Sequence, residues 1–122
     1  MMNRNLVVSV VDDDESVRES LPELLKMFGY IAKAFSSAEA FLRYGDMTAT
    51  ACLILDIGMP GISGPELQDE LKKRSISIPI IFITAQRDEP LRSKLIRQGA
   101  IACLYKPFSE TALLDALNSA LP

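Results

Sequence analysis

The sequence contains no histidine. Without an imidazole, the chain cannot form a serine-type triad, a histidine zinc site or a phosphohistidine of its own. Cysteine is also scarce, because only Cys52 and Cys103 are present and each lies in an apolar segment. This placement favours two buried free thiols over a disulfide. A phosphohistidine that takes part in the function must therefore belong to another protein.

Long apolar runs and an excess of positive charge are missing as well. No apolar run is long enough to span a bilayer, and the N-terminus lacks the apolar stretch of a signal peptide, so we expect a cytoplasmic protein without membrane contact. Thirteen Lys and Arg residues against sixteen Asp and Glu give a net charge of −3, which argues against direct nucleic-acid binding. With 122 residues, of which 48% are hydrophobic, we expect one domain over residues 1–122.

Short apolar runs instead alternate with amphipathic stretches along the chain. The runs predict strands over Leu6–Val11, Tyr30–Ala34, Cys52–Leu55, Pro79–Ile83 and Ile101–Tyr105. The stretches between and after them predict helices over Glu15–Phe28, Ser36–Arg43, Ser63–Arg74, Glu89–Gln98 and Ser109–Leu121. This alternation predicts a parallel sheet covered by helices on both faces, a three-layered α/β fold.

Two local signals refine these helices. Pro22 lies inside the first helix and predicts a kink or a late start, because proline removes one backbone hydrogen bond. Ser36 with Glu39, and Ser63 with Glu66, have the spacing of capping boxes at the starts of the second and third helices.

Polar residues follow four of the apolar runs where each predicted strand ends. Asp12 and Asp13 follow the first run, Asp56 the third, Thr84 the fourth and Lys106 the fifth. Because ligands of open parallel sheets bind beyond the carboxyl ends of the strands, we expect these residues to share one edge. Taken singly, each of these residues could have a purely structural role, as a helix cap, a turn residue or a solvated lysine. Polar residues at four strand ends in this order favour a common site.

The residue types then indicate the chemistry. The carboxylates of Asp12, Asp13 and Asp56 would repel one another, and a hard divalent cation such as Mg²⁺ resolves that conflict. A carboxylate beside Mg²⁺ can attack phosphorus and form an acyl phosphate. Lys106 can contact the phosphoryl group as a compact charge, and the Thr84 hydroxyl can hydrogen-bond to it. The pattern predicts a phosphoryl acceptor site.

Four segments resemble the motifs of receiver domains from two-component response regulators. They are Val10–Asp14, Leu55–Pro60 together with Gly64, Ile83–Ala85, and Lys106–Phe108. The resemblance covers essentially the whole chain. It implies a flavodoxin-like, doubly wound α/β fold, with a five-stranded parallel sheet in the order 2-1-3-4-5 and five helices.

The resemblance also implies roles for the site residues. Asp56 is expected to accept a phosphoryl group from the phosphohistidine of a sensor histidine kinase. Asp13 and Asp56 are expected to bind Mg²⁺ directly, Asp12 mainly through water, and Gly58 through its backbone carbonyl. The chain would be a switch and not an enzyme, with self-phosphorylation and self-dephosphorylation as its only chemistry.

One position departs from the family. Its switch links the residue at Thr84 to an aromatic side chain on the last strand, and Cys103 occupies the matching position here. Tyr105 lies nearby, and we expect it on the opposite face of that strand. We still expect Thr84 to shift on phosphorylation. Lys106 is expected to precede a cis peptide bond to Pro107.

The resemblance extends to a class of regulators. Ser37–Leu42 and Lys106–Phe108 are similar to the receivers of FixJ-like regulators, which carry a LuxR-type helix-turn-helix. We therefore expect an output domain beyond Pro122 that controls transcription and makes any DNA contact. Phosphorylation is expected to drive homodimerisation through the fourth helix and the fifth strand. A stand-alone receiver is the alternative.

Two further functions fit less well. In haloacid-dehalogenase-like phosphatases an aspartate nucleophile follows the first strand and a second acid lies two residues on, as Asp12 and Asp14 do here. Those enzymes also need an acidic pair beyond the lysine strand, which Pro107–Pro122 does not provide. A flavodoxin-type small-molecule module would need a Ser/Thr/Gly-rich phosphate loop after the first strand, where this chain is acidic.

Overall fold

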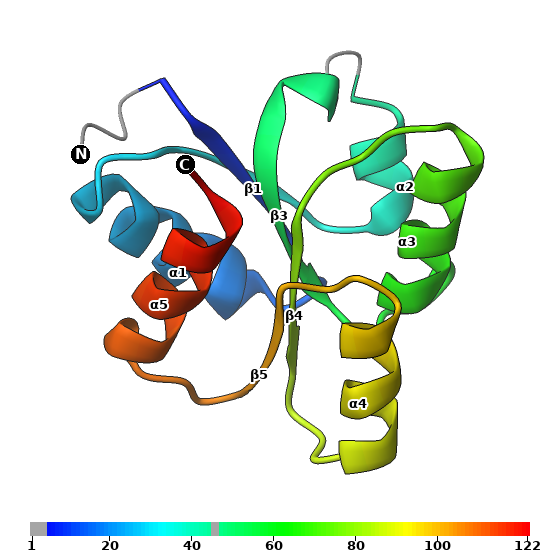
Figure 1. Ribbon diagram of the computed structural model, residues 1–122. Coiled ribbons are helices and arrows are strands. Elements are labelled where there is room, and N and C mark those ends of the chain that lie inside the picture. Colours follow the sequence, from blue (N-terminus) through cyan, green and yellow to red (C-terminus); the bar gives the residue numbers. More distant parts are fainter. Residues whose placement is uncertain (1–4, 45–46) are drawn as a thin grey trace.

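Five strands form one parallel sheet in the order β2-β1-β3-β4-β5 (Figure 1). The computed structural model describes residues 5–44 and 47–122. The strands are β1 (Val7–Val11), β2 (Ile31–Phe35), β3 (Thr50–Asp56), β4 (Ile80–Thr84) and β5 (Ala102–Tyr105). The sheet order expected for a flavodoxin-like fold is confirmed.

Helices cover both faces of this sheet, as expected (Figure 1). They are α1 (Glu15–Met27), α2 (Ala38–Leu42), α3 (Gly64–Lys73), α4 (Glu89–Arg97) and α5 (Glu110–Ala120), and a 3-10 helix, η1 (Met47–Ala49), precedes β3. Helices α1 and α5 pack on one face through side chains such as Leu25 and Leu117. Helices α2, α3 and α4 pack on the other face through Phe41, Leu67 and Leu95.

The central strand β3 shows why the sheet is buried on both sides. Cys52 and Ile54 belong to the apolar cluster under α1 and α5, whereas Leu53 and Leu55 belong to the cluster under α2, α3 and α4. All four side chains are fully buried. Because successive residues of a strand point to opposite faces, a continuous apolar run serves two cores at once.

The start of α1 corrects one expectation. The side chain of Asp14 caps the helix by accepting a hydrogen bond from the Ser16 backbone N–H at 2.9 Å. With this cap the helix begins at Glu15 and continues on both sides of Pro22, so of the two alternatives expected from Pro22 the late start is wrong.

The capping box expected at Ser36 and Glu39 is also wrong. The N-cap of α2 is Ser37, whose Oγ accepts from the Ala40 backbone N–H at 3.0 Å. The Glu39 carboxylate instead accepts from the backbone N–H of Ile62, at 3.3 Å, in the loop that follows β3. This long-range contact takes the glutamate away from the helix start, and it ties α2 to the loop beside the sheet's carboxyl edge.

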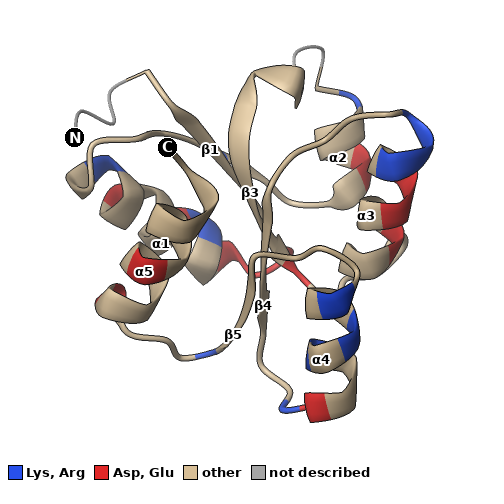
Figure 2. Ribbon diagram, viewed as in Figure 1, with Lys and Arg blue, Asp and Glu red and all other residues tan. Residues whose placement is uncertain are grey.

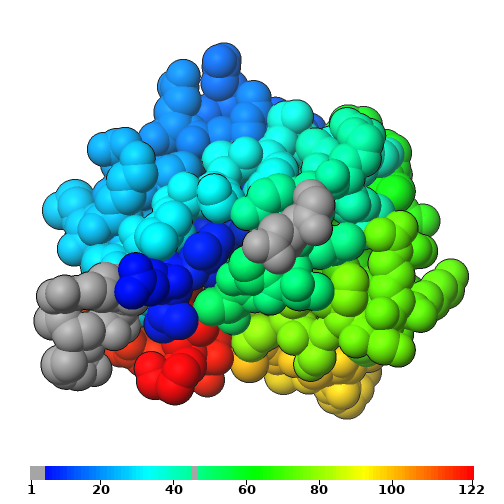
Figure 3. Space-filling model, turned by 90° about the horizontal axis from the view of Figure 1, so that it is seen from above, coloured from blue at the N-terminus to red at the C-terminus, as the bar shows by residue number. Residues whose placement is uncertain are grey.

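The two edges of the sheet have different contents. Acidic residues gather at the carboxyl edge, where β1 and β3 end (Figure 2). The amino edge carries both ends of the described chain, since Leu6 precedes β1, Leu121 follows α5, and both pack against the same apolar cluster. Figure 3 looks onto this edge, where the blue and red segments adjoin. Within the described residues, none of the helices has the length and apolar character needed to cross a membrane.

Candidate functional site

The carboxyl edge of the sheet brings together all the residues predicted for the site. Asp12 and Asp13 directly follow β1, Asp56 and Thr84 are the last residues of β3 and β4, and Lys106 directly follows β5. A pocket of about 260 Å³ opens at this edge. Its lining consists of Asp12, Asp13, Asp14, Asp56, Ile57, Gly58, Thr84, Ala85, Gln86 and Lys106.

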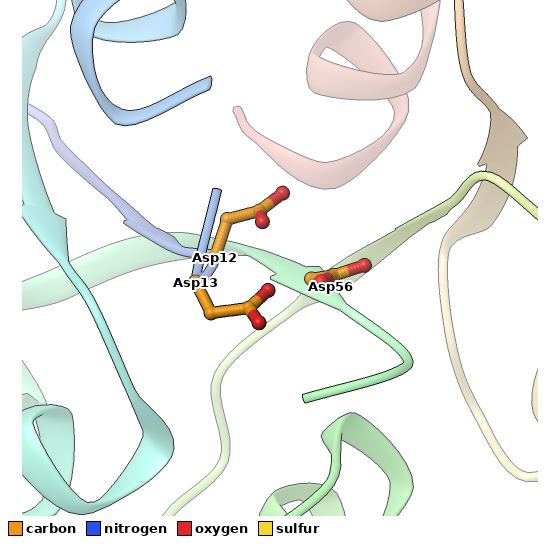
Figure 4. A group of neighbouring side chains, drawn as sticks. All are labelled: Asp12, Asp13 and Asp56. Carbon is orange, nitrogen blue, oxygen red and sulfur yellow. The ribbon is translucent and has the colours of Figure 1, made fainter. Parts of the chain in front are cut away.

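Three carboxylates form the acidic centre of the pocket (Figure 4). Asp12, Asp13 and Asp56 each offer an oxygen, and these oxygens lie within 4.8 Å of one another. Asp12 and Asp56 are buried, whereas Asp13 is exposed. Hard carboxylate oxygens at such spacing, open to solvent on one side, fit a Mg²⁺ ion that keeps some of its water. Gly58 lines the same pocket.

Neighbouring groups fix the orientation of Asp12. Its Oδ1 accepts from the Asp14 backbone N–H at 2.9 Å, and its Oδ2 accepts from the Lys106 ammonium at 2.9 Å. The Arg18 guanidinium donates to the Asp12 backbone carbonyl at 3.0 Å. Arg18 was not among the predicted site residues, because only the direction of α1 reveals that its side chain reaches back to the strand end.

The pKa of the Asp56 carboxyl group is higher than that of an ordinary aspartate. Burial raises its pKa from 3.8 to about 7, and the charge on Asp12 adds to this effect. The Lys106 ammonium, 3.6 Å from Asp56 Oδ1, opposes the rise. A group that sheds its proton near neutrality is a basic carboxylate once ionised, and a good oxygen nucleophile for phosphorus.

Lys106 keeps its charge in this partly buried position. Burial alone would lower the pKa of its ammonium group, but the hydrogen bond to Asp12 and the charge on Asp56 together raise that pKa. The peptide bond between Lys106 and Pro107 is cis, as expected. The site thus carries a fixed positive charge between two carboxylates.

Thr84 lies at the end of β4 with a buried side chain. Its Oγ1 accepts a hydrogen bond from the Gln86 backbone N–H at 3.1 Å. The hydroxyl lies 3.5 Å from the Gln86 carbonyl, which is too long for a strong hydrogen bond. The Thr84 proton is therefore available to an acceptor that arrives in the pocket.

The loop from β3 to α3 fixes the backbone beside Asp56. Ser63 and Glu66 form the expected capping box. The Ser63 backbone N–H donates to the Glu66 carboxylate at 2.9 Å, and the Glu66 backbone N–H donates to Ser63 Oγ at 3.3 Å. The Gly64 N–H donates to the Ile57 carbonyl at 3.0 Å. A Cβ at Gly64 would clash with the Asp56 carbonyl oxygen. Only glycine therefore lets α3 start this close to the acidic centre.

Contacts between α4 and β5 lie next to the site. The Tyr105 hydroxyl donates to Glu89 at 2.6 Å, and the Arg87 guanidinium lies over the Tyr105 ring at 4.7 Å from its centre. Arg92 donates to the Cys103 carbonyl at 3.1 Å. Cys103 is buried in the cluster under α2, α3 and α4. The expectation that Tyr105 lies on the opposite strand face is wrong, because residues two apart share a face and its hydroxyl reaches α4.

Comparisons with known proteins agree with this geometry. The family model of the response regulator receiver domain matches residues 8–118. Response regulator protein TodT from Pseudomonas putida is 42% identical over 121 residues, which cover 99% of this chain and 53% of TodT. Transcriptional regulatory protein FixJ from Azorhizobium caulinodans is 40% identical over 120 residues, which cover 98% of this chain and 57% of FixJ.

Solved structures show the same likeness. The structure of response regulator StyR is 47% identical with a TM-score of 0.87, over 96% of this chain and 59% of that one. The FixJ-N crystal structure is 38% identical with a TM-score of 0.85, over 96% of this chain and 94% of that one. The chain spans about half the length of the curated relatives it matches.

Proposed function

This chain belongs to the response regulator receiver domain family of two-component systems, and we propose that Asp56 is its phosphoryl acceptor. The donor is the phosphohistidine of a sensor histidine kinase. The observation that carries the proposal is the position of Asp56, buried at the end of β3 with two further carboxylates and the Lys106 ammonium around it.

The neighbouring acids are less suited to this role. Both oxygens of Asp12 already accept hydrogen bonds, one from the Asp14 N–H and one from Lys106. Asp13 is exposed, so its carboxylate is open to water and is not enclosed by neighbouring side chains. Asp56 combines burial, a pKa near neutrality and an adjacent ammonium group.

In the transfer step, an oxygen of the Asp56 carboxylate attacks phosphorus while the bond from phosphorus to the imidazole nitrogen breaks. The electron pair of that bond goes to the nitrogen, and an acyl phosphate is left on Asp56. The Lys106 ammonium pairs with the negative charge of the transferred phosphoryl group, and the Thr84 hydroxyl donates a hydrogen bond to one of its oxygens.

The acidic centre is proposed to hold Mg²⁺. Asp13 and Asp56 would bind the ion directly, together with the Gly58 carbonyl, and Asp12 would act through water because its own oxygens are engaged. The ion, when bound, neutralises the phosphoryl oxygens. The donor set of three carboxylates supports this assignment.

Acetyl phosphate tests the acceptor directly. We expect incubation with Mg²⁺ to give one phosphoryl adduct by intact mass, which decays with time and is missing in Asp56→Asn. Asp69→Asn is a matched control, because Asp69 is an exposed residue of α3, and this variant should still take up the phosphoryl group. An adduct that persists in Asp56→Asn would overturn the assignment. Steady phosphate release without an adduct would instead support a haloacid-dehalogenase-like phosphatase.

We further propose that the chain is the receiver part of a longer transcription regulator, which contacts DNA only through an output domain. The support is that the match to this chain covers only 53% of TodT and 57% of FixJ. A stand-alone receiver is the alternative. Phosphorylation is proposed to drive homodimerisation through α4 and β5, where Ile96 is 38% exposed.

Sedimentation with Mg²⁺ and beryllium fluoride tests the dimer. We expect the wild-type chain to shift from monomer to dimer, and Ile96→Glu on α4 to stay monomeric while still binding beryllium fluoride. Met27→Glu is the control, because Met27 is also a large apolar residue and is even more exposed than Ile96, but lies on α1. A wild-type chain that stays monomeric at high concentration would contradict the proposed interface.

A further inference from the structure

Asp13 differs from the other two carboxylates of the acidic centre in how it is held. Within the part of the chain that the structure describes, no group forms a hydrogen bond or ion pair with its exposed side chain. Asp12, by contrast, accepts two hydrogen bonds, and Asp56 lies 3.6 Å from the Lys106 ammonium. Figure 4 shows Asp12 and Asp13 extending from consecutive residues toward Asp56. The position of the Asp13 carboxylate therefore depends on the backbone that carries it.

One hydrogen bond fixes the peptide group that joins Asp12 to Asp13. The Arg18 guanidinium donates to the Asp12 carbonyl at 3.0 Å. The Asp12 N–H donates to the Phe35 carbonyl at 3.1 Å, and both carboxylate oxygens of Asp12 accept hydrogen bonds. Arg18 thus completes the bonding of Asp12 and sets the direction in which the chain continues to Asp13.

The place of Arg18 in α1 explains why it reaches the strand end. Arg18 is half-buried and belongs to the first turns of the helix, and helical side chains tilt toward the N-terminus. A guanidinium there is unfavourable for the helix itself, because positive charge near a helix N-terminus opposes the helix dipole. The favourable contribution of Arg18 is therefore its bond to the Asp12 carbonyl, outside the helix.

We propose that Arg18 is a positioning residue for Mg²⁺, which holds the Asp12 carbonyl and thereby places the Asp13 carboxylate where it can bind the ion. This inference rests on the proposed Mg²⁺ site. Removal of a group that is bonded directly to a metal-ligating side chain typically weakens metal binding by about 10–100-fold. Arg18 acts through the backbone next to a ligand, so we expect a smaller effect of roughly three- to tenfold.

The charge of Arg18 by itself predicts the opposite effect. Hydrogen bonds from Ser16 chiefly lower the pKa of Asp14, and the charge on Arg18 adds to this effect, so the guanidinium also acts on the acidic turn electrostatically. A positive charge near the carboxylates repels Mg²⁺, and its removal alone would tighten binding. Loss of a positioning residue weakens binding instead. The sign of the change distinguishes the two roles.

Calorimetric titration with Mg²⁺ measures this sign. Arg18→Met removes the donor and the charge, and we expect it to bind Mg²⁺ roughly three- to tenfold more weakly than the wild-type chain. Arg18→Lys keeps the charge and a donor, and should bind more tightly than Arg18→Met. Lys26→Met is the matched control, because it removes a positive charge from the exposed end of the same helix, and its affinity should stay within about twofold of the wild-type value. Circular dichroism shows whether each variant is folded.

Phosphorylation by acetyl phosphate gives a second readout. We expect the Mg²⁺ concentration that gives half of the maximal rate to rise in Arg18→Met by the same factor as the dissociation constant. The maximal rate at saturating Mg²⁺ should stay close to that of the wild-type chain. A role confined to stability would lower the unfolding temperature and change neither quantity.

Unchanged or tighter Mg²⁺ binding in folded Arg18→Met would overturn the inference, and so would a lower maximal rate at an unchanged half-saturating concentration. If Arg18→Met does not fold, Arg18→Gln, which likewise lacks the charge and has a shorter side chain, takes its place. Asp13→Asn should lose most of the Mg²⁺ affinity whatever the role of Arg18. A wild-type chain that does not bind Mg²⁺ would remove the proposed metal site together with this inference.

Discussion

At the scale of single residues, Asp56 links the chemistry of the site to the stability of the chain. Its pKa is about 7 in the folded state and near 3.8 in the unfolded chain. Between these two values the folded state binds more protons, so the free energy of unfolding falls as the pH rises. This loss begins above pH 3.8 and is complete above pH 7. The acceptor is thus a destabilising group at the pH where it works.

Asp56→Asn should therefore stabilise the chain without Mg²⁺. The rise in pKa is worth at most about 4 kcal/mol, and solvent screening and Lys106 reduce it, so we expect roughly 1–3 kcal/mol at pH 8. At pH 4 the two chains should differ much less. Urea unfolding in EDTA at both pH values measures this. If the two chains differed in unfolding free energy by the same amount at pH 4 and pH 8, the raised pKa of Asp56 would be refuted.

At the scale of elements, the β3–α3 loop sets the position of the acceptor. A Cβ at Gly64 would meet the Asp56 carbonyl oxygen, and that backbone has little room to move because the Gly64 N–H is bonded to Ile57. We expect Gly64→Ala to lower the free energy of unfolding by about 1–3 kcal/mol, as overpacking of a tight contact does. It should also slow phosphorylation by acetyl phosphate, because the start of α3 must move.

Gly58→Ala is the control for this prediction. Gly58 belongs to the same loop and lines the pocket, but a Cβ there would have no atom within 4 Å. We expect its unfolding free energy to stay within about 0.5 kcal/mol of the wild-type value, apart from small propensity effects. Equal losses in both variants would mean that loop flexibility, and not the clash at Gly64, is responsible.

The elements also show where sequence reasoning succeeds and where it fails. Strand ends were predictable because apolar runs end abruptly at Asp12, Asp56 and Thr84, and parallel topology brings such ends together. The predicted N-cap of α2, Ser36, is one residue away from the observed cap, Ser37. The two serines are neighbours, and the prediction relied on Glu39, whose carboxylate binds the distant Ile62 N–H and not the start of the helix.

Features that depend on packing between elements were not predictable. The reach of Arg18 to the Asp12 carbonyl depends on the direction of α1 relative to the sheet. The burial of Gln68 Oε1 without a hydrogen-bond partner among the described residues depends on how α3 packs against the rest of the fold. The face of Tyr105 was within reach of sequence reasoning, because the two-residue period of a strand places it with Cys103.

At the scale of the whole molecule, Mg²⁺ should stabilise the fold in a pH-dependent way. An ion that binds only the folded chain raises its stability by mass action, and a proton on Asp56 competes with it. Since the pKa of Asp56 is about 7, we expect Mg²⁺ affinity to rise about fivefold from pH 6 to 7, about tenfold from pH 6 to 8, and to level off above pH 8.

Calorimetric titration at several pH values measures this affinity. Asp56→Asn should bind Mg²⁺ more weakly and with a much flatter pH profile, because the titrating carboxylate is gone. An unchanged profile in this variant would mean that another group sets the pH dependence.

The layout of the chain ends has a practical consequence for protein engineering. Leu6 and Leu121 lie at the amino edge of the sheet, and the acceptor lies at the opposite edge, separated by a strand of about 16 Å. A fluorescent protein fused beyond either residue would leave the acidic pocket open to a kinase. Such a reporter can detect the phosphoryl group only through movements of the strands and helices in between.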